Sequence, residues 1–286
     1  MTGHATTLRT LLDAPELLRA PGVFDGLSAH LVRRAGFRAA YLTGAGVAAS
    51  GFGLPDIGLI TQTEMVERVR VIAEACEIPL IADADTGYGT ALHTVRTVRA
   101  YESAGVAAIQ LEDQVFPKRC GHLQDKQVVD TEQFARTLTA ALEARRGDTV
   151  VIARTDARGP LGLDEAIARA HRYAEVGADL IFVEAPESRA EITRIAAEID
   201  APLLFNVVPA GRSPEIGDDE LERLGFRAAI YPGALLAPVA GAMAAALTAM
   251  GGTAAVTPGP AGLFGLVGLD EWQQLSERYR LEGALA

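Results

Sequence analysis

Cysteine and long hydrophobic runs are both scarce in this sequence of 286 residues. Its two cysteines, Cys76 and Cys120, are too few for a disulfide framework and suit a reducing compartment. No apolar run approaches the roughly 20 residues that a transmembrane helix needs. The N-terminal stretch MTGHATTLRT lacks the apolar core and cleavage site of a signal peptide. We therefore expect a cytoplasmic protein without a membrane partner.

Positive charge is also in short supply. The chain has 26 lysines and arginines against 37 aspartates and glutamates, which gives a formal net charge of −11. This balance argues against nucleic acid or anionic lipid as the main partner, because both repel an acidic surface. An anionic metabolite would need a local group of cations or a metal ion to hold it. The length allows one large domain with a single extensive core.

Short β-branched and apolar runs recur along the chain, and amphipathic helical patterns separate them. Strands that alternate with helices pair in parallel, and eight such units favour an α/β fold of the (β/α)8 TIM-barrel type over an open doubly wound sheet. The eight candidate strands cover residues 22–24, 39–43, 79–83, 107–112, 150–155, 179–184, 202–207 and 228–232.

The C-terminal part follows a different pattern. Residues 251–263 are rich in Gly, Pro and Ala and predict a break, and residues 269–283 (LDEWQQLSERYRLEG) predict one more helix outside the eight units. We therefore divide the chain into a catalytic barrel, residues 1–250, and a linker with a terminal helix, residues 251–286.

Polar side chains follow the predicted strands where each strand ends, which is the edge at which the active site of such a barrel lies. Asp83 and Asp85 would point to the same side in extended geometry and suit Mg²⁺. The alternative is that they only cap the next helix or shape the turn before Gly87 and Gly89. Glu112, at the end of the neighbouring strand, favours the metal, whereas Asp113 should face the other way and be structural. Arg154, Asp156, Glu184 and Asn206 end further strands of this rim.

A glycine-rich stretch, residues 43–53 (TGAGVAASGFG), partly resembles a dinucleotide-binding fingerprint. That fingerprint requires a helix directly behind the first glycines. We expect Gly51, Gly53 and Pro55 to break any such helix, and we prefer an anion-binding turn whose backbone N–H groups face a carboxylate or phosphate. A plain tight loop is the alternative.

The two cysteines have different surroundings. Cys76 ends a run with helical spacing and is predicted to be a buried core thiol. Cys120 lies in PKRCGH, beside Lys118, Arg119 and His122, so we expect a lowered thiol pKa and a role as acid or nucleophile. The alternative is an exposed loop cysteine with chance neighbours. Zinc is not expected, because Cys-x-His supplies two ligands and no second pair is found.

Seven segments together resemble the isocitrate lyase/phosphoenolpyruvate mutase superfamily, in particular its methylisocitrate lyase-like and carboxyphosphonoenolpyruvate phosphonomutase-like members. They extend from about residue 20 to 235 and read YLTGAG, GLPDIG, ADADTGYG, QLEDQVFPKRCGH, ARTDA, FVEA and FNVV. The resemblance implies a (β/α)8 barrel and a Mg²⁺ ion, with Mn²⁺ as a substitute. It also implies that the C-terminal helix, residues 269–283, packs on a neighbouring subunit in a homotetramer.

The resemblance further implies roles for individual residues. Asp83, Asp85 and Glu112 would hold the metal, and Cys120 would donate the proton that quenches the departing enolate. Tyr41 would handle the substrate hydroxyl. Asp56 would lie on a mobile loop or near the metal. The implied substrate-binding residues are Thr43, Gly44, Ala45, Gly46, Lys118, Arg119, Gly121, His122, Arg154, Glu184 and Asn206.

The activity implied is cleavage of a C–C bond in a small 2-hydroxy or 2-oxo di- or tricarboxylic acid by retro-aldol or retro-Claisen chemistry. Leu123, Ala234 and Ala237 stand where methylisocitrate lyases tend to have cationic or polar residues. A third carboxylate would then be unpaired in a closed site. We expect a substituted malate or an oxaloacetate-like acid. The alternatives are a phosphonomutase acting on a carboxyphosphonoenolpyruvate-like compound and a catalytically silent barrel that binds a metabolite.

Overall fold

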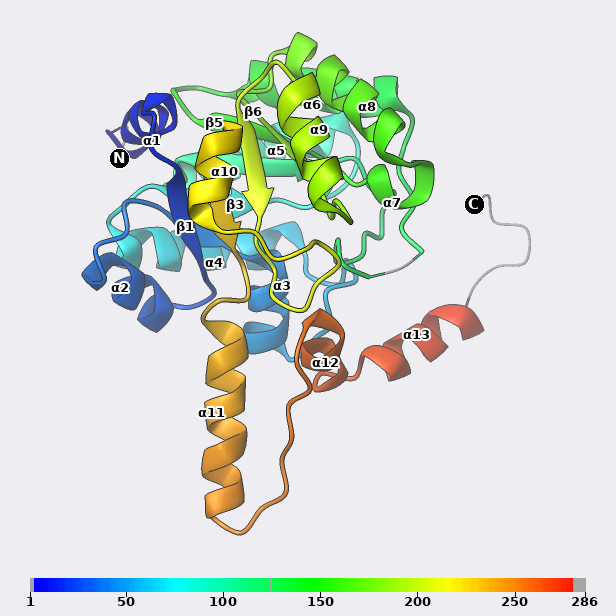
Figure 1. Cartoon of the computed structure of the whole chain (residues 1–286). Helices are drawn as coiled ribbons and strands as arrows, with labels where there is room; N and C mark the ends of the chain where they lie inside the picture. Colours follow the sequence, from blue (N-terminus) through cyan, green and yellow to red (C-terminus); the bar gives the residue numbers. More distant parts are fainter. Residues whose placement is uncertain (1–2, 124, 280–286) are drawn as a thin grey trace.

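Eight parallel strands close into a barrel in sequence order, so the predicted (β/α)8 fold is confirmed (Figure 1). The computed structural model describes residues 3–123 and 125–279. The strands are β1 (Leu18–Val23), β2 (Ala40–Leu42), β3 (Leu80–Asp83), β4 (Ala108–Glu112), β5 (Val150–Thr155), β6 (Leu180–Val183), β7 (Leu203–Asn206) and β8 (Ala228–Tyr231). β1 begins four residues before the expected 22–24, and residues 18–21 pair with β8 to close the barrel.

Helices follow the strands and surround the barrel, as the amphipathic patterns predict. They are α1 (Gly3–Asp13), α2 (Gly26–Arg34), α3 (Gly44–Val47), α4 (Gln62–Cys76), α5 (Ala91–Ala104), α6 (Thr131–Ala144), α7 (Arg158–Leu161), α8 (Leu163–Val176), α9 (Arg189–Glu198) and α10 (Asp218–Leu224), followed by α11 (Leu236–Ala249), α12 (Pro260–Gly265) and α13 (Leu269–Arg278). Cys76 is fully buried at the end of α4, as predicted. Within the described part of the chain, no helix combines the length and apolar character needed to cross a bilayer.

The position of the polar rim follows from the alternation of inward- and outward-facing side chains along each strand. The interior of the barrel is filled by side chains such as Ile81, Ile152 and Phe182. Because side chains alternate along a strand, the positions two residues after these also face inward. Asp83 and Arg154 therefore lie inside the barrel at the carboxyl ends of β3 and β5, above the apolar filling, and the Arg154 guanidinium lies 5.3 Å from the centre of the Phe182 ring.

Asp113 has the opposite orientation and a structural role, as predicted. Its carboxylate accepts hydrogen bonds from Thr155 Oγ1 (2.7 Å), the Asp156 backbone N–H (2.8 Å) and Tyr173 Oη (2.9 Å). Arg169 Nη1 lies 3.1 Å from Asp113 Oδ2. These contacts join β4, β5 and α8 behind the active-site rim.

Asp113→Asn is expected to lower the free energy of unfolding by about 1–3 kcal/mol, because it removes a buried charge-assisted network. Urea denaturation measures this loss. Glu165→Gln is the matched control, since Glu165 pairs with the same Arg169 at 2.9 Å but is exposed. That variant should lose less than about 1 kcal/mol. Equal losses in both variants would contradict the structural role.

The C-terminal part leaves the barrel and returns to it. α11 has the sequence LAPVAGAMAAALTA, is uncharged all round, and projects away from the barrel (Figure 1). Residues 251–259 form the predicted break, but α12 begins inside the range expected to be irregular. The last predicted helix, 269–283, is observed as α13 to Arg278, and residues 280–283 lie outside the described part. The division into domains at residue 250 stays a prediction.

Candidate active site

A cavity of about 450 Å³ opens at the carboxyl ends of the strands. It collects most of the residues that the sequence nominated. These are Tyr41, Thr43, Ala45, Gly46, Asp56, Asp83, Lys118, Cys120, Gly121, His122, Arg154, Glu184 and Asn206. The four nominated residues that do not line it are Gly44, Asp85, Glu112 and Arg119.

Two of these four residues lie just behind the cavity wall. Gly44 packs on Asp83, and a Cβ at Gly44 would come within 2.8 Å of Asp83 Oδ2. Asp85 is not extended, as the sequence argument assumed, because β3 ends at Asp83 and Asp85 has a φ of 48°. Its backbone N–H donates to Asp83 Oδ1 (3.2 Å), which makes a tight turn, and its carboxylate faces Lys118.

The other two support the wall differently. Glu112 lies beside Arg154, with 3.2 Å between Arg154 Nη1 and Glu112 Oε2. Arg119 contributes its main chain: its N–H donates to Gln114 Oε1 (3.0 Å) and its carbonyl accepts from Gln114 Nε2 (2.8 Å). The main chain of Arg119 therefore holds the loop in position.

The glycine-rich stretch corrects one expectation. α3 opens directly after Thr43, and a π-helical turn over Ala48–Phe52 continues it, so Gly51 does not break the helix. Thr43 Oγ1 accepts from the Gly46 N–H (3.1 Å), which caps α3. The helical path ends only at Gly53, in left-handed conformation with a φ of 63°. The helix forms because small residues let it pack close to the barrel rim.

Buried negative charge exceeds buried positive charge around the cavity. Every residue of this group is at most 8% exposed. The acidic members are Asp56, Asp83, Asp85, Glu112, Asp156 and Glu184, and the basic members are Lys118, Lys126 and Arg154. Because an unpaired buried carboxylate is costly, this imbalance suits a bound cation.

Arg154 is the centre of the positive charge. Its guanidinium donates to Asp156 through Nε (2.8 Å) and Nη2 (3.1 Å), and Nη2 lies 3.3 Å from Glu184 Oε2. Burial by itself would raise the pKa of Asp156, but Arg154 and Lys126 outweigh burial and hold that pKa below its usual range. Asp156 therefore stays ionised and orients Arg154.

Glu112 has Arg154 as an ion-pair partner but lacks the hydrogen bonds that a buried carboxylate needs. Neither of its oxygens accepts a hydrogen bond from the residues that the structure describes. Burial raises its pKa well above the usual value, and Arg154 offsets this only in part. Burial likewise raises the pKa of Asp85 to about 6, with Lys118 opposing the rise and Asp83 adding to it. For both carboxylates, the neighbouring cation therefore offsets only part of the effect of burial.

These carboxylates fit a Mg²⁺ ion. Within residues 3–123 and 125–279, no three Asp, Glu, His or Cys side chains already converge as a metal centre. Mg²⁺ does not require such convergence, because it binds through one or two carboxylates and keeps several waters. The free oxygens of Glu112 are suited to accept hydrogen bonds from such waters.

The loop that carries Cys120 is fixed on both sides. Lys118 Nζ lies 2.5 Å from Asp56 Oδ1 and 2.9 Å from Asp85 Oδ1. The Cys120 N–H donates to the Asp56 carbonyl (3.0 Å). Further along, Lys126 Nζ donates to the Gly121 carbonyl (2.6 Å). The loop is therefore held across the cavity.

The expected lowering of the Cys120 pKa is wrong. Burial raises the pKa of this thiol to about 12, the Asp56 carboxylate adds to the rise, and Lys118 opposes it too weakly to reverse it. The sequence suggested a thiol among cations, but Asp56 and Asp85 already neutralise Lys118. Cys120 is thus a neutral thiol, which suits a proton donor and not a thiolate nucleophile.

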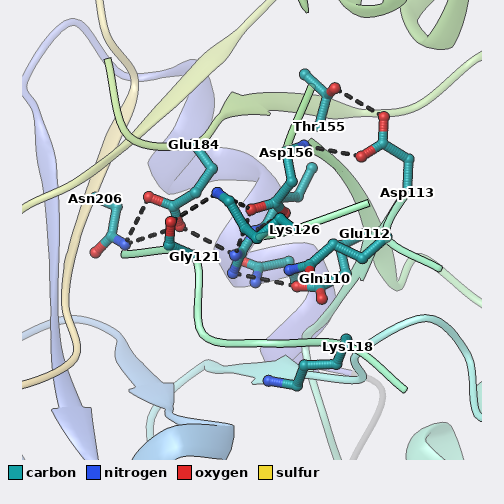
Figure 2. Close-up of polar contacts among 12 residues, drawn as sticks. Gln110, Glu112, Asp113, Lys118, Gly121, Lys126, Thr155, Asp156, Glu184 and Asn206 are labelled. Carbon is teal, nitrogen blue, oxygen red and sulfur yellow. Dashed lines mark hydrogen bonds and ion pairs between the residues drawn. The ribbon is translucent and has the colours of Figure 1, made fainter. Parts of the chain in front are cut away.

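His122 and Asn206 both face Glu184. His122 Nδ1 accepts from the Arg212 N–H (3.0 Å), so its proton lies on Nε2, 3.4 Å from Glu184 Oε1. Burial lowers the pKa of His122, which favours the neutral ring. Asn206 Nδ2 donates to Glu184 Oε2 (3.2 Å; Figure 2). This side of the cavity therefore presents neutral hydrogen-bond donors around one carboxylate.

The sequence argument did not nominate Lys126 or Gln110, and it placed Asp156 on the rim without giving it a role. Lys126 pairs with Asp156 at 2.7 Å and points toward both Asp156 and Gly121 (Figure 2). Gln110 Nε2 donates to Tyr41 Oη (3.0 Å). Asp156, two residues after Arg154, could have been recognised as its partner from spacing alone. Lys126 follows no local pattern that marks it.

Comparison with known proteins adds independent information. A family model described as phosphoenolpyruvate phosphomutase matches residues 8–251. A 2,3-dimethylmalate lyase of Eubacterium barkeri is 47% identical over 247 residues, which cover 86% of this chain and 86% of that protein. A 2-methylisocitrate lyase of Bacillus subtilis is 45% identical over 228 residues, which cover 80% of this chain and 75% of that protein.

Solved structures agree with the sequence matches. Oxaloacetate acetylhydrolase in complex with the inhibitor 3,3-difluorooxalacetate superposes with a TM-score of 0.83 at 37% identity and covers 98% of each chain. A phosphonopyruvate hydrolase in complex with oxalate and Mg²⁺ superposes with a TM-score of 0.77 at 31% identity, covering 98% of this chain and 99% of that one. The likeness therefore extends over the barrel and the C-terminal helices.

Proposed function

This chain belongs to the phosphoenolpyruvate mutase/isocitrate lyase superfamily, and we propose that it is a Mg²⁺-dependent lyase that cleaves a C–C bond of a small 2-hydroxy or 2-oxo dicarboxylic acid, such as a substituted malate. One observation carries the proposal: a single cavity brings the neutral thiol of Cys120 together with Arg154 and the carboxylate of Asp83. The relatives named as dimethylmalate lyase and oxaloacetate acetylhydrolase support the substrate class.

Asp83, Asp85 and Glu112 are the residues that would hold Mg²⁺. The ion would supply positive charge to the oxo-acid fragment as negative charge develops on its oxygens. Arg154, oriented by Asp156, would bind a substrate carboxylate.

The cleavage balances without an added oxidant or reductant. The substrate 2-hydroxyl loses its proton to a carboxylate of the rim, the hydroxyl oxygen forms the new carbonyl, and the C2–C3 electron pair moves to C3. Cys120 gives its proton to C3, and the proton released from the hydroxyl restores the thiol. Tyr41 donates a hydrogen bond to the substrate oxygen, since burial raises its pKa well above the usual value and keeps the phenol neutral.

The charge of the substrate follows from the rest of the lining. Ala234 and Ala237 line the cavity beyond β8, and neither can pair with an anion. Leu123, the residue after His122, likewise offers no cation. A dicarboxylate therefore fits this site better than a tricarboxylate.

A panel of acids tests the proposal. Substituted malates, oxaloacetate and 2-methylisocitrate are incubated with Mg²⁺ or with a chelator, and pyruvate, glyoxylate and oxalate are measured. We expect chelator-sensitive cleavage with the highest kcat/KM for a substituted malate. A higher kcat/KM for 2-methylisocitrate would contradict the proposed charge. A new C–P signal in phosphorus NMR would instead establish a phosphonomutase, and tight binding without any turnover would establish a silent binding barrel.

We also propose that α11 packs on a second copy of the chain within a homotetramer. Its exposed side chains include Met243 (62%) and Leu247, and Met250 (83%) follows directly after it, which is an unusual amount of apolar surface for a helix in water. An uncharged helix of this kind is stable only when another apolar surface covers it.

The double substitution Met243→Glu with Leu247→Glu is therefore expected to shift the protein to a smaller species, because it buries charge in the proposed interface. Analytical ultracentrifugation measures the mass. Leu92→Glu is the control, since Leu92 is 81% exposed on α5, away from α11. A mass unchanged in the double variant would refute a role of α11 in assembly.

A further inference from the structure

The cavity has an apolar wall that the chemistry described so far does not use. Its residues come from three separate segments: the loop after β7, the segment after β8 and the C-terminal residues 256–264. Representative members are Val208, Pro232, Leu236, Val256, Leu263 and Phe264. The polar rim, in contrast, comes from the strand ends and the Cys120 loop. The cavity therefore combines a charged part with a distinctly apolar part.

The C-terminal segment is a fixed part of this wall. Phe264 is 1% exposed, and Leu269, at the start of α13, is 6% exposed. Gly259 packs against the loop after β7, where a Cβ would come within 3.1 Å of the Ala210 carbonyl oxygen. Figure 1 shows α12 returning to the barrel after the excursion of α11. The chain thus folds its own C-terminal part back along one side of the site.

The size of the cavity exceeds what the polar chemistry requires. A volume of about 450 Å³ lies within the range of pockets that enclose drug-sized ligands, roughly 300–1,000 Å³. A four-carbon dicarboxylate would be held by the rim and would leave the apolar wall facing empty space. Water gains little there, because aliphatic side chains offer it no hydrogen-bond partners. An apolar part of the substrate is the occupant that fits.

We propose that the preferred substrate is a malate with a linear alkyl substituent on C3, in the range from propyl to hexyl, which lies against Leu236, Leu263 and Phe264. The inference rests on the proposed lyase function. The carboxylates and the 2-hydroxyl stay at the polar rim, and the substituent extends toward residues 256–264. Cleavage then yields a short 2-oxo acid and a fatty acid that retains the alkyl chain.

Binding of 2-alkylsuccinates tests the apolar wall without depending on turnover, because these acids lack the 2-hydroxyl and cannot be cleaved. Isothermal titration calorimetry in the presence of Mg²⁺ gives the Kd for the methyl to hexyl series. We expect a tightening of about two- to fourfold for each added methylene. A Kd that is constant or rises with chain length would overturn the inference.

A filling variant localises the effect. Ala237→Phe places a ring in the lining and should reduce the ratio of methyl to hexyl Kd at least tenfold. Ala261→Phe is the matched control, because Ala261 lies on the exposed side of α12 and does not line the cavity; its ratio should equal that of the unchanged protein. An equal change in both variants, or none in either, would place the alkyl chain elsewhere and contradict the proposal.

The two proposals fail in different ways. If 3-alkylmalates are cleaved with kcat/KM independent of chain length, the lyase function stands and the apolar wall has no role in specificity. If alkylsuccinates bind more tightly with length while no malate is cleaved, the wall binds alkyl chains but the assigned reaction is wrong.

Discussion

Cys120→Ala is expected to lower kcat for malate cleavage by about 10²–10⁴-fold, which is the usual contribution of a positioned general acid. The carbanion equivalent left at C3 must receive a proton, and the neutral thiol of Cys120 lines the cavity in which it forms. Steady-state kinetics with the best substrate of the panel measures the loss. Oxalate has no group that needs the thiol, so its Kd should stay within about threefold, well under the roughly 1.4 kcal/mol of a tenfold change.

Cys76→Ala is the matched control, because Cys76 is the other cysteine of the chain and is fully buried in the core at the end of α4. It should cost about 1 kcal/mol of stability and leave kcat unchanged. If Cys120→Ala retained full activity, another group would have to donate the proton, and the assignment of Cys120 as the proton donor would be wrong. Loss of oxalate binding along with activity would instead indicate that the substitution had disordered the loop.

The fold could be predicted because its signals are local. Each of the strands β2 to β8 is a short apolar run followed by a helical pattern, and the runs lie within one residue of the observed limits. β1 was recognised only at its end, because Arg19, Pro21 and Gly22 interrupt the apolar run in its sequence, LRAPGV. Gly22 is needed there for contact with β8, as a Cβ would come within 2.3 Å of the Pro232 carbonyl oxygen.

The polar rim could also be predicted, because alternation along a strand decides which side chain faces inward. Alternation gave the orientation of Asp83 and assigned Asp113 correctly to the outer face, whereas Arg154 and Glu184 were located by the ends of their strands. It does not extend past the end of a strand, so it was wrong for Asp85, whose orientation depends on a turn.

The remaining features depend on contacts between distant parts of the chain. The raised pKa of Cys120 follows first from burial in the tertiary structure and then from Asp56, more than sixty residues earlier, which also neutralises Lys118. The apolar wall depends on residues 256–264 returning to the barrel after α11. Spacing within one segment carries no information on either, since both require the tertiary structure.

Glu112→Gln is expected to raise the Tm of the metal-free protein while it abolishes the stabilisation by Mg²⁺. Without a metal, Glu112 buries a carboxylate whose oxygens accept no hydrogen bond, and burial raises its pKa. A neutral amide of the same shape removes that cost, about 1–3 kcal/mol. Arg154 keeps Asp156 and Glu184 as partners, so it is not left unpaired.

Thermal denaturation with chelator and with saturating Mg²⁺ measures both effects. The unchanged protein should gain about 2.7 kcal/mol when Mg²⁺ is present at a hundred times its Kd, whereas Glu112→Gln should gain little. Activity should fall by at least about a hundredfold, because the ion is no longer held where charge develops. Glu165→Gln, on the exposed side of α8, should follow the unchanged protein in every measurement. If Mg²⁺ raised the Tm of the Glu112 variant as much as that of the unchanged protein, Glu112 would not belong to the metal site.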